Sequence, residues 1–328
     1  MTTGLRVGNA QIIGSRTEQQ DAFGFTDKDD ESFVRHGGVA AVVADGMGGH
    51  AHGGDASRIA VRAFLHCYMS KPEHLSIPDA LRQAFDAANR AVCAFAEEAG
   101  ETGNCGTTLI AAAVHPASHS LHWIGTGDSR IFLFRRPQWV QVTIDSNYGN
   151  QLLNGQIQGI PSDFLWENER QLQGLTSFLG LTDIGEIDCS IRGFRLHPKD
   201  WLVLCSDGVY DTLTKDEMVD CLSGDPNLAC EDIIREVSAK NLNHQDNATL
   251  AIIACDVGAD PALTATQDSQ RRAFIVKLGL VVLFIIAIAG TFSVGLYAGQ
   301  GCIPDSQFGF WGQIRSTLIC LKAKFELK

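Results

Sequence analysis

Residues 39–50 read V-A-A-V-V-A-D-G-M-G-G-H, and this stretch decides the fold of the chain. Its apolar run predicts a buried strand that ends at Asp45. A carboxylate at the mouth of a core strand needs a partner, because burying a bare charge costs too much free energy. A hard divalent cation is a natural partner, and the following glycines let a backbone carbonyl approach the same point. Taken alone, D-G-x-G-G is more often a simple strand with a glycine-rich turn.

Three more aspartates stand at the ends of apolar runs. Asp128 follows W-I-G-T-G, Asp207 follows W-L-V-L-C-S, and Asp246 precedes N-A-T-L-A-I-I. If these strands form packed sheets, the acids meet at one rim, where they repel one another unless cations intervene. Oxygen ligands without a His or Cys pattern select Mg²⁺ or Mn²⁺ over zinc, and two such ions suit phosphoryl chemistry. Arg16 supplies a planar donor fork that matches a phosphate.

The charge of the chain is unevenly distributed. The chain has 328 residues, 45% of them hydrophobic, and a net charge of −12. Residues 1–270 carry 19 basic and 36 acidic groups, a net charge of −17, whereas residues 271–328 carry +5. This acidic body argues against nucleic acid as a partner. The ten cysteines show no C-x-x-C pair or zinc spacing, which is typical of a reducing compartment, and the N-terminus lacks an apolar signal region.

Hydrophobic periodicity predicts an alternation of strands and helices. Apolar residues at helical spacing indicate helices over residues 57–68 and from Ser76 to residue 95, both lying on a sheet face. Residues 145–174 are polar and irregular and predict an inserted flap, and the acidic cluster at residues 27–31 predicts a solvated hairpin loop. Strands are expected at residues 6–15, 22–25, 39–44, 109–114, 121–126, 130–134, 139–143, 187–196, 201–205 and 249–255, and further helices at 216–222 and 229–239.

The ordered motifs R-x-x-x-x-D, D-G-M-G-G-H, G-T-T, G-D-S-R, S-D-G and D-N resemble the PPM family of metal-dependent serine/threonine protein phosphatases in its bacterial form. The resemblance covers residues 5–256. It implies an α+β fold with a central antiparallel β-sandwich flanked by helices on both faces, a four-layer αββα arrangement. It also implies hydrolysis of phosphoserine and phosphothreonine in proteins by a water that two Mn²⁺ or Mg²⁺ ions activate, with a third, weaker ion in bacterial members.

Position by position, the resemblance assigns a role to each matching residue. Arg16 matches the phosphate-binding arginine, and Asp45 matches the carboxylate that bridges both metals. The Gly46 carbonyl matches a ligand of the second metal, while Asp207 and Asp246 match ligands of the first. Arg16 and Asp45 are therefore the predicted catalytic residues.

Two further acids complete the predicted metal ligands, and two positions depart from the family pattern. Asp128 matches the acid that joins Asp207 around the third metal, and Asp21 matches an acid that holds metal-bound waters. Gln20 stands where the family commonly has Glu, so the affinity of the second metal site is expected to be lower. Met47 stands where some members carry a histidine proposed as general acid. The general acid is therefore left open.

The C-terminal part of the chain predicts a membrane anchor. Residues 278–297 carry no charge and are long enough to span a bilayer core, with Arg271, Arg272 and Lys277 just before them. The predicted organisation is a catalytic domain at 1–256, a linker at 257–273, a transmembrane helix at 274–299 and a short tail at 300–328. The positive-inside rule keeps the catalytic domain cytoplasmic, on a single-pass protein of the inner membrane.

Alternatives to this interpretation stay open. The tail at 300–328 is either an interfacial amphipathic helix or an ordinary tail. The apolar segment could instead dock a partner. The phosphatase-like domain could be a catalytically weak module that binds or senses phosphoproteins at the membrane, for which Gln20 is the support. The expected partners are phosphorylated proteins, substrates of a serine/threonine kinase, and the membrane.

Overall fold

The structure is a computed structural model, and it describes residues 4–47, 52–156 and 172–255. All of them belong to one compact unit, Met1–Ala259. The predicted linker, transmembrane helix and tail lie outside the described residues, so these assignments stay predictions. Within the described ranges, no helix combines the length and the apolar character that a bilayer crossing requires.

Two antiparallel sheets form the centre of the unit. The first sheet has the strand order β1-β12-β11-β7-β8 and the second the order β10-β6-β5-β3-β2. In the second sheet, β4 pairs with β3 and β9 pairs with β6. The strands are β1 (Leu5–Ile12), β2 (Asp21–Phe25), β3 (Val39–Met47), β4 (Gly106–Thr107), β5 (Leu109–His115), β6 (Ser120–Thr126), β7 (Arg130–Arg135), β8 (Gln138–Gln141), β9 (Asp188–Cys189), β10 (Phe194–Arg195), β11 (Trp201–Cys205) and β12 (Ala248–Cys255).

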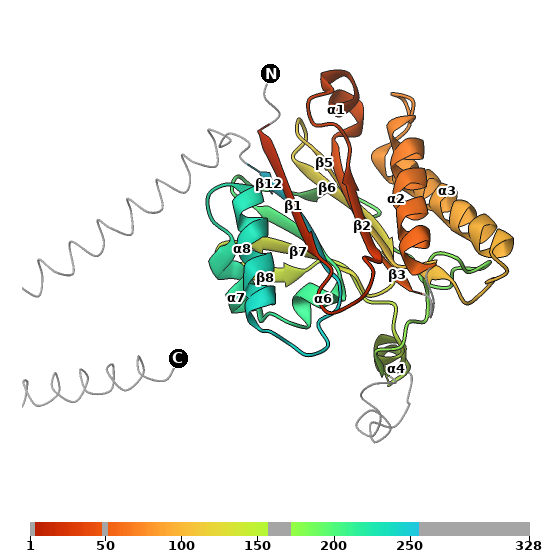
Figure 1. The fold of residues 1–328 in the computed structure, drawn as a ribbon. Helices are drawn as coiled ribbons and strands as arrows, with labels where there is room; N and C mark the ends of the chain where they lie inside the picture. Colours follow the sequence, from red (N-terminus) through yellow and green to blue (C-terminus); the bar gives the residue numbers. More distant parts are fainter. Residues whose placement is uncertain (1–3, 48–51, 157–171, 256–328) are drawn as a thin grey trace, which may run out of the picture. The chain divides into compact units, whose positions relative to one another are not determined.

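Helices cover the outer face of each sheet, as Figure 1 shows. The helices α2 and α3 lie on the second sheet, and α6, α7 and α8 lie on the first. The α+β sandwich flanked by helices that the resemblance implied is therefore confirmed. The helices are α1 (Glu31–Gly37), α2 (Gly53–Met69), α3 (Ile77–Glu98), α4 (Tyr148–Gln156), α6 (Asp207–Tyr210), α7 (Lys215–Cys221) and α8 (Pro226–Ala239).

Strand β3 explains why the deciding stretch is apolar without interruption. Its residues alternate between two cores: Ala40, Val42 and Ala44 pack under α2 and α3, whereas Val39, Ala41 and Val43 pack between the two sheets. A strand that is buried on both faces has no polar face, so it reads as a continuous hydrophobic run. The same alternation holds for β12, which divides its residues between the helix-covered core and the inter-sheet core.

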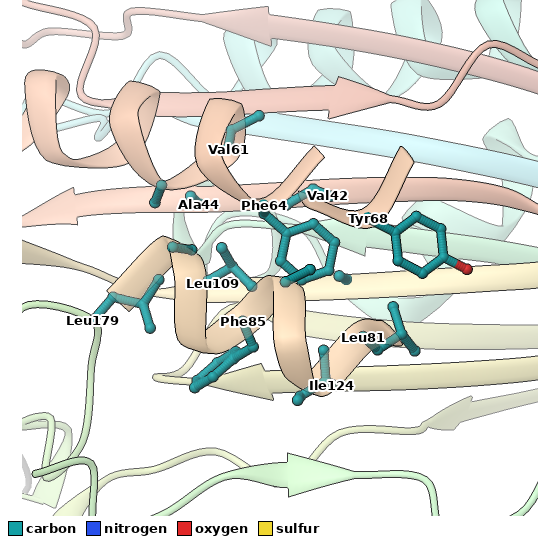
Figure 2. Close-up of a cluster of buried hydrophobic side chains, with 14 of the residues drawn as sticks. Val42, Ala44, Val61, Phe64, Tyr68, Leu81, Phe85, Leu109, Ile124 and Leu179 are labelled. Carbon is teal, nitrogen blue, oxygen red and sulfur yellow. The ribbon is translucent and has the colours of Figure 1, made fainter. Parts of the chain in front are cut away.

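The core beneath α2 and α3 is shown in Figure 2. The rings of Phe64 and Tyr68 stack with their centroids 6.1 Å apart, and both side chains are buried. The Tyr68 hydroxyl donates a 2.7 Å hydrogen bond to the Gly37 carbonyl oxygen. This bond offsets the cost of burying a polar group in an apolar layer.

Several local predictions were wrong in extent. The predicted strand at residues 187–196 is two short strands, β9 and β10. Between them the Ser190 N–H donates to the Trp123 carbonyl oxygen, but the Trp123 N–H donates to the Ser190 hydroxyl, so the side chain replaces the backbone acceptor and the chain then bends. The acidic cluster is an exposed loop as expected, but the side chain of Asp30 caps a helix, α1, that begins directly after it. The predicted irregular flap contains the helix α4. The helix predicted at 57–68 begins earlier, at Gly53.

The antiparallel register gives the sandwich two distinct ends. Ile12 of β1 pairs with Ala248 of β12 at one end, and Leu5 pairs with Cys255 at the other. Cys205 of β11 pairs with Leu250, so the segment that follows β11 lies at the same end as the start of β12. The predicted site residues that follow β11 and precede β12 are thereby brought to one end.

Candidate metal centre

A pocket of about 350 Å³ opens at the end of the sandwich where β3 and β11 finish. Six of the seven predicted site residues line it, and Asp21 does not. We call this end of the sandwich the acid end. The lining residues are Arg16, Gln20, Asp45, Gly46, Met47, Thr108, Asp128, Leu175, Asp207 and Asp246.

Three hydrogen bonds fix the backbone of Asp45. Its N–H donates to Thr108 Oγ1 (2.9 Å), and its carbonyl oxygen accepts from Thr107 Oγ1 and from the Thr108 N–H (2.8 Å each). The G-T-T motif therefore holds Asp45 in place at the end of β3. Sequence reasoning gave this motif a structural role and missed that Thr108 itself lines the pocket.

Gly46 is required by a close approach of the backbone. A Cβ atom at this position would lie 2.0 Å from the Gly53 carbonyl oxygen at the start of α2. Only glycine leaves room for that approach. The Gly46 N–H donates to the Gln20 carbonyl oxygen (3.1 Å), which also accepts from Ser57 Oγ (2.5 Å). The first residues of α2 are thus joined to the floor of the pocket.

Asp207 starts the short helix α6 directly after β11. The following Gly208 again permits close backbone contact, since a Cβ there would lie 2.0 Å from the Asn247 carbonyl oxygen. The Gln245 side chain donates to the Gly208 carbonyl oxygen (3.2 Å). These contacts hold the start of α6 against the segment that carries Asp246.

Arg16 lies on the loop between β1 and β2, and Asn247 holds that loop. The Asn247 side-chain amide donates to the carbonyl oxygens of Ile13 (2.8 Å) and Glu18 (3.0 Å), and its Oδ1 accepts from the Gln20 N–H (2.7 Å). Arg16 Nη2 donates to Asp246 Oδ2 (2.5 Å), and the Arg16 side chain is 55% exposed. The D-N motif therefore provides both a predicted ligand and the residue that positions the arginine loop.

Asp128 lies in the turn between β6 and β7 and has a different set of neighbours. The Tyr210 hydroxyl donates to the Asp128 carbonyl oxygen (3.0 Å). The Arg130 guanidinium stacks 3.7 Å above the Tyr210 ring and donates two hydrogen bonds to Asp145 Oδ2 (2.7 and 3.1 Å). Nothing in the sequence pattern indicated that Tyr210 contacts the site. A residue one helical turn after Asp207 is more often an ordinary core residue.

Asp21 lies behind Asp45, away from the pocket. The two residues face each other in the register of β2 and β3, and Asp21 is only 4% exposed. Ser206 Oγ donates to Asp21 Oδ2 (2.7 Å), while Oδ1 has no hydrogen-bond partner among the residues that the structure describes. Its placement allows it to act on the pocket through Asp45.

The crowding of carboxylates raises their pKa values. Burial, followed by the charges of Asp21 and Asp207, raises the pKa of Asp45 well above its ordinary range. Burial and then the charge of Asp128 raise the pKa of Asp207 to about 7. Burial and the charge of Asp145 raise the pKa of Asp128 to about 6. The fully ionised site is therefore costly for the protein alone.

The donor set fits divalent cations of the Mg²⁺ and Mn²⁺ type. All its ligands would be oxygens, and the buried Oδ1 atom of Asp207 has no hydrogen-bond partner within the described part of the chain. Among those same residues, no three His, Cys, Asp or Glu side chains already form a complete ligand group. The backbone carbonyl of Gly46 and water would therefore complete the coordination.

Comparison with known proteins identifies the family to which this chain is similar. A protein-family model described as protein phosphatase 2C matches residues 10–251. A serine/threonine phosphatase, stp, of Listeria welshimeri is 29% identical over 233 residues, which cover 70% of this chain and 86% of the relative.

Solved structures are similar over the same region. The PPM Ser-Thr phosphatase MsPP of Mycobacterium smegmatis, in complex with cacodylate, is 28% identical with a TM-score of 0.59 and covers 77% of this chain and 98% of that one. The catalytic domain of the phosphatase PstP, in complex with two manganese ions, has the same fold at 24% identity and a TM-score of 0.59, covering 76% and 97% of the two chains. With its family model matched over most of its length, this chain belongs to the protein phosphatase 2C family.

Proposed function

We propose that this chain is a metal-dependent phosphatase that hydrolyses phosphoserine and phosphothreonine in proteins. The observation that carries the proposal is the pocket of about 350 Å³ in which four aspartates face one arginine, in a chain of this family. The acids supply a site for divalent cations, and the arginine supplies the complement to a phosphate dianion.

The proposed ligands are oxygens of residues that line the pocket. Asp45, the Gly46 carbonyl, Asp207 and Asp246 would hold two Mn²⁺ or Mg²⁺ ions, and Asp128 would share a third, weaker ion with Asp207. When bound, the ions neutralise phosphate charge and lower the pKa of a water molecule so that it can serve as the nucleophile.

The chain's own residues bind and orient the substrate. Arg16 uses one terminal nitrogen, Nη2, on Asp246, which leaves its other guanidinium donors for phosphate oxygens. Asn247 holds the loop that carries Arg16 through the backbone carbonyls of Ile13 and Glu18, which supports the placement of the guanidinium at the pocket. Met47 and Leu175 add apolar surface to the pocket, and the Met47 thioether has no proton to give to a leaving group.

The experiment that tests this function uses the full chain and a phosphothreonine peptide. We expect phosphate release in Mn²⁺, its loss after chelation and its return when Mn²⁺ is restored. A phosphotyrosine peptide of the same sequence is the matched control for substrate class. Binding of the phosphothreonine peptide without turnover at any Mn²⁺ concentration would contradict the enzyme and favour a phosphoprotein-binding module instead.

The location of the protein is also part of the proposal. We propose that residues 274–299 anchor it as a single-pass protein of the inner membrane, that residues 1–256 form a cytoplasmic catalytic domain, and that its substrates are phosphorylated by a serine/threonine kinase. The uncharged stretch at 278–297 and the basic residues just before it support the anchor. After carbonate washing, a spanning chain stays in the membrane pellet, whereas a partner-docking helix releases the protein into the supernatant.

A further inference from the structure

The end of the sandwich opposite the acid end carries a basic surface. Four exposed basic residues lie on the β7–β8 turn and on the segment from β9 to β11: Arg136, Arg192, Arg195 and Lys199. The segments 189–199 and 135–138 contain no Asp or Glu. We call these four residues, with Ile191 and Phe194, the basic patch.

Hydrogen bonds between these segments show that the patch is one surface. Arg135 on β7 donates to the Arg195 carbonyl oxygen (3.1 Å), and the Leu196 N–H donates to the His119 carbonyl oxygen (2.7 Å). The Lys199 N–H donates to the carbonyl oxygen of Cys255, the last residue of β12 (2.6 Å). The patch therefore borders the end of β12 at Lys199.

The carboxylate that directly precedes β11 in this region is buried and paired. Asp200 is 1% exposed and accepts two hydrogen bonds from Arg135 (2.7 and 3.0 Å) and one from the His197 N–H (2.7 Å). Its charge is thus compensated inside the protein. The exposed acids of residues 27–31 follow β2, the strand at the far edge of the second sheet from β10. The part of the patch that joins the second sheet therefore lies at the edge of that sheet opposite these acids.

Two apolar side chains stand out from the patch. Ile191 is 89% exposed and Phe194 is 42% exposed. Exposed apolar side chains among basic ones are typical of surfaces that lie at a membrane interface, where the cations meet phosphates and the apolar groups enter the headgroup layer.

We propose that the basic patch docks the catalytic domain on a surface of anionic phospholipid headgroups, with the acid end turned away from it. The inference rests on the membrane anchor proposed above. Because residues 1–270 carry a net charge of −17, docking on such a surface requires a face on which the exposed charge is basic. The linker at 257–273 follows within two residues of Cys255, so the patch is the part of the domain from which the proposed anchor is reached.

The test compares the full chain in nanodiscs of phosphatidylcholine with the full chain in nanodiscs that also contain phosphatidylglycerol. We expect amide hydrogen exchange in segments 189–199 and 135–138 to slow only with the anionic lipid. The protection should disappear in about 1 M salt, where the screening length is about 3 Å.

The decisive variant is the triple charge reversal Arg136→Glu, Arg192→Glu and Lys199→Glu, which should abolish the protection. The docked-to-free ratio should fall roughly fivefold for each basic residue lost. The matched control reverses Arg62, Arg82 and Arg90, three exposed residues on α2 and α3, with the same change in charge. That control should keep the protection, and both variants should keep hydrolysis of a soluble phosphopeptide.

Equal protection in both lipids, or equal loss in both variants, would overturn the proposal. Protection by an added RNA or phosphopeptide, without protection by anionic lipid, would identify a different polyanion and also overturn it. If the chain stays soluble and does not enter nanodiscs, the anchor fails by itself. Co-sedimentation of that soluble chain with phosphatidylglycerol vesicles then decides the patch.

Discussion

The two ends of strand β11 present the same residue type in opposite circumstances. Asp200 directly precedes the strand and Asp207 follows it by two residues. Asp200 is 1% exposed and fully engaged by Arg135 and the His197 N–H. Asp207 has a buried oxygen that finds no hydrogen-bond partner in the described part of the chain, and it faces other carboxylates.

This difference separates an acid that stabilises the fold from an acid that is available to a ligand. A paired, buried carboxylate contributes to stability, and its removal leaves an uncompensated cation. A carboxylate crowded by others costs stability until a cation arrives. The same substitution, Asp to Asn, should therefore have opposite effects at the two ends.

The largest effect is expected at the acid end. Asp207→Asn should lower hydrolysis of a phosphothreonine peptide in Mn²⁺ by at least about a thousandfold, because a ligand of the metal site is lost. Initial rates across a Mn²⁺ titration measure this. Asp220→Asn, an exposed acid on α7, is the matched control and should hydrolyse the peptide normally. If the Asp207 variant hydrolysed the peptide at the wild-type rate, Asp207 would not be a ligand of the metal site.

At the other end of β11, Asp200→Asn should reduce the free energy of unfolding by about 3 kcal/mol, because Arg135 loses its partner in a mostly buried position. Denaturant unfolding in the presence of a chelator measures this. In the same assay Asp207→Asn should be neutral or stabilising. If both variants lowered the free energy of unfolding by the same amount, the two aspartates would not differ in their contribution to stability.

Arg16→Ala should act on substrate binding more than on metal binding. We expect the KM for the phosphopeptide to rise about thirtyfold, since the variant lacks the charged fork that faces the phosphate. The Mn²⁺ concentration for half-maximal activity should change little. Arg62→Ala, on the exposed face of α2, is the control. A change confined to kcat would place Arg16 elsewhere in the mechanism.

The stability of the metal-free protein should depend on pH at the acid end. Folding raises the pKa of Asp207 from 3.8 to about 7, so the folded chain holds more protons than the unfolded chain between those values. The free energy of unfolding therefore falls as pH rises through this window, by up to about 4 kcal/mol. Thermal unfolding in chelator at several pH values should show this fall. Asp207→Asn should flatten it, and a rise in stability with pH would contradict the burial of unpaired acids.

The smallest effect is expected from Gln20→Glu, which adds a carboxylate to the pocket lining. The Mn²⁺ concentration for half-maximal activity should fall about threefold, because ligand charge raises cation affinity. Gln83→Glu on the exposed face of α3 is the control. An unchanged Mn²⁺ dependence would show that position 20 does not tune the second metal site.

Much of the fold could be predicted because its central strands are buried on both faces. The apolar runs that became β3, β11 and β12 were visible without any alternation of polar residues. Residue Ser76 was expected to begin a helix, and its side chain accepts from the Asp79 N–H at the start of α3. Helices α1, α4 and α6 were missed because they are short, and their apolar residues do not complete a periodic face.

The sequence predicted that the site aspartates lie close together, because each stands at the end of an apolar strand. It did not predict the residues that hold these aspartates in place. Asn247, Tyr210 and Thr108 hold the site through hydrogen bonds to backbone atoms far away in sequence. A hydrogen bond between Asn247 and Ile13 leaves no spacing or composition signal, because it depends on how β1 and β12 pair. The roles of the individual site residues stay predictions that the substitutions above test.

The pairing of Leu5 with Cys255 brings the two boundaries of the sandwich side by side on neighbouring strands. Directly opposed residues of antiparallel strands lie about 5 Å apart, so a few residues could join them. The domain is therefore suited to circular permutation, with new termini opened in the β5–β6 turn at its exposed residues 117–118. Reporter domains could be fused there without crossing the pocket that the aspartates line.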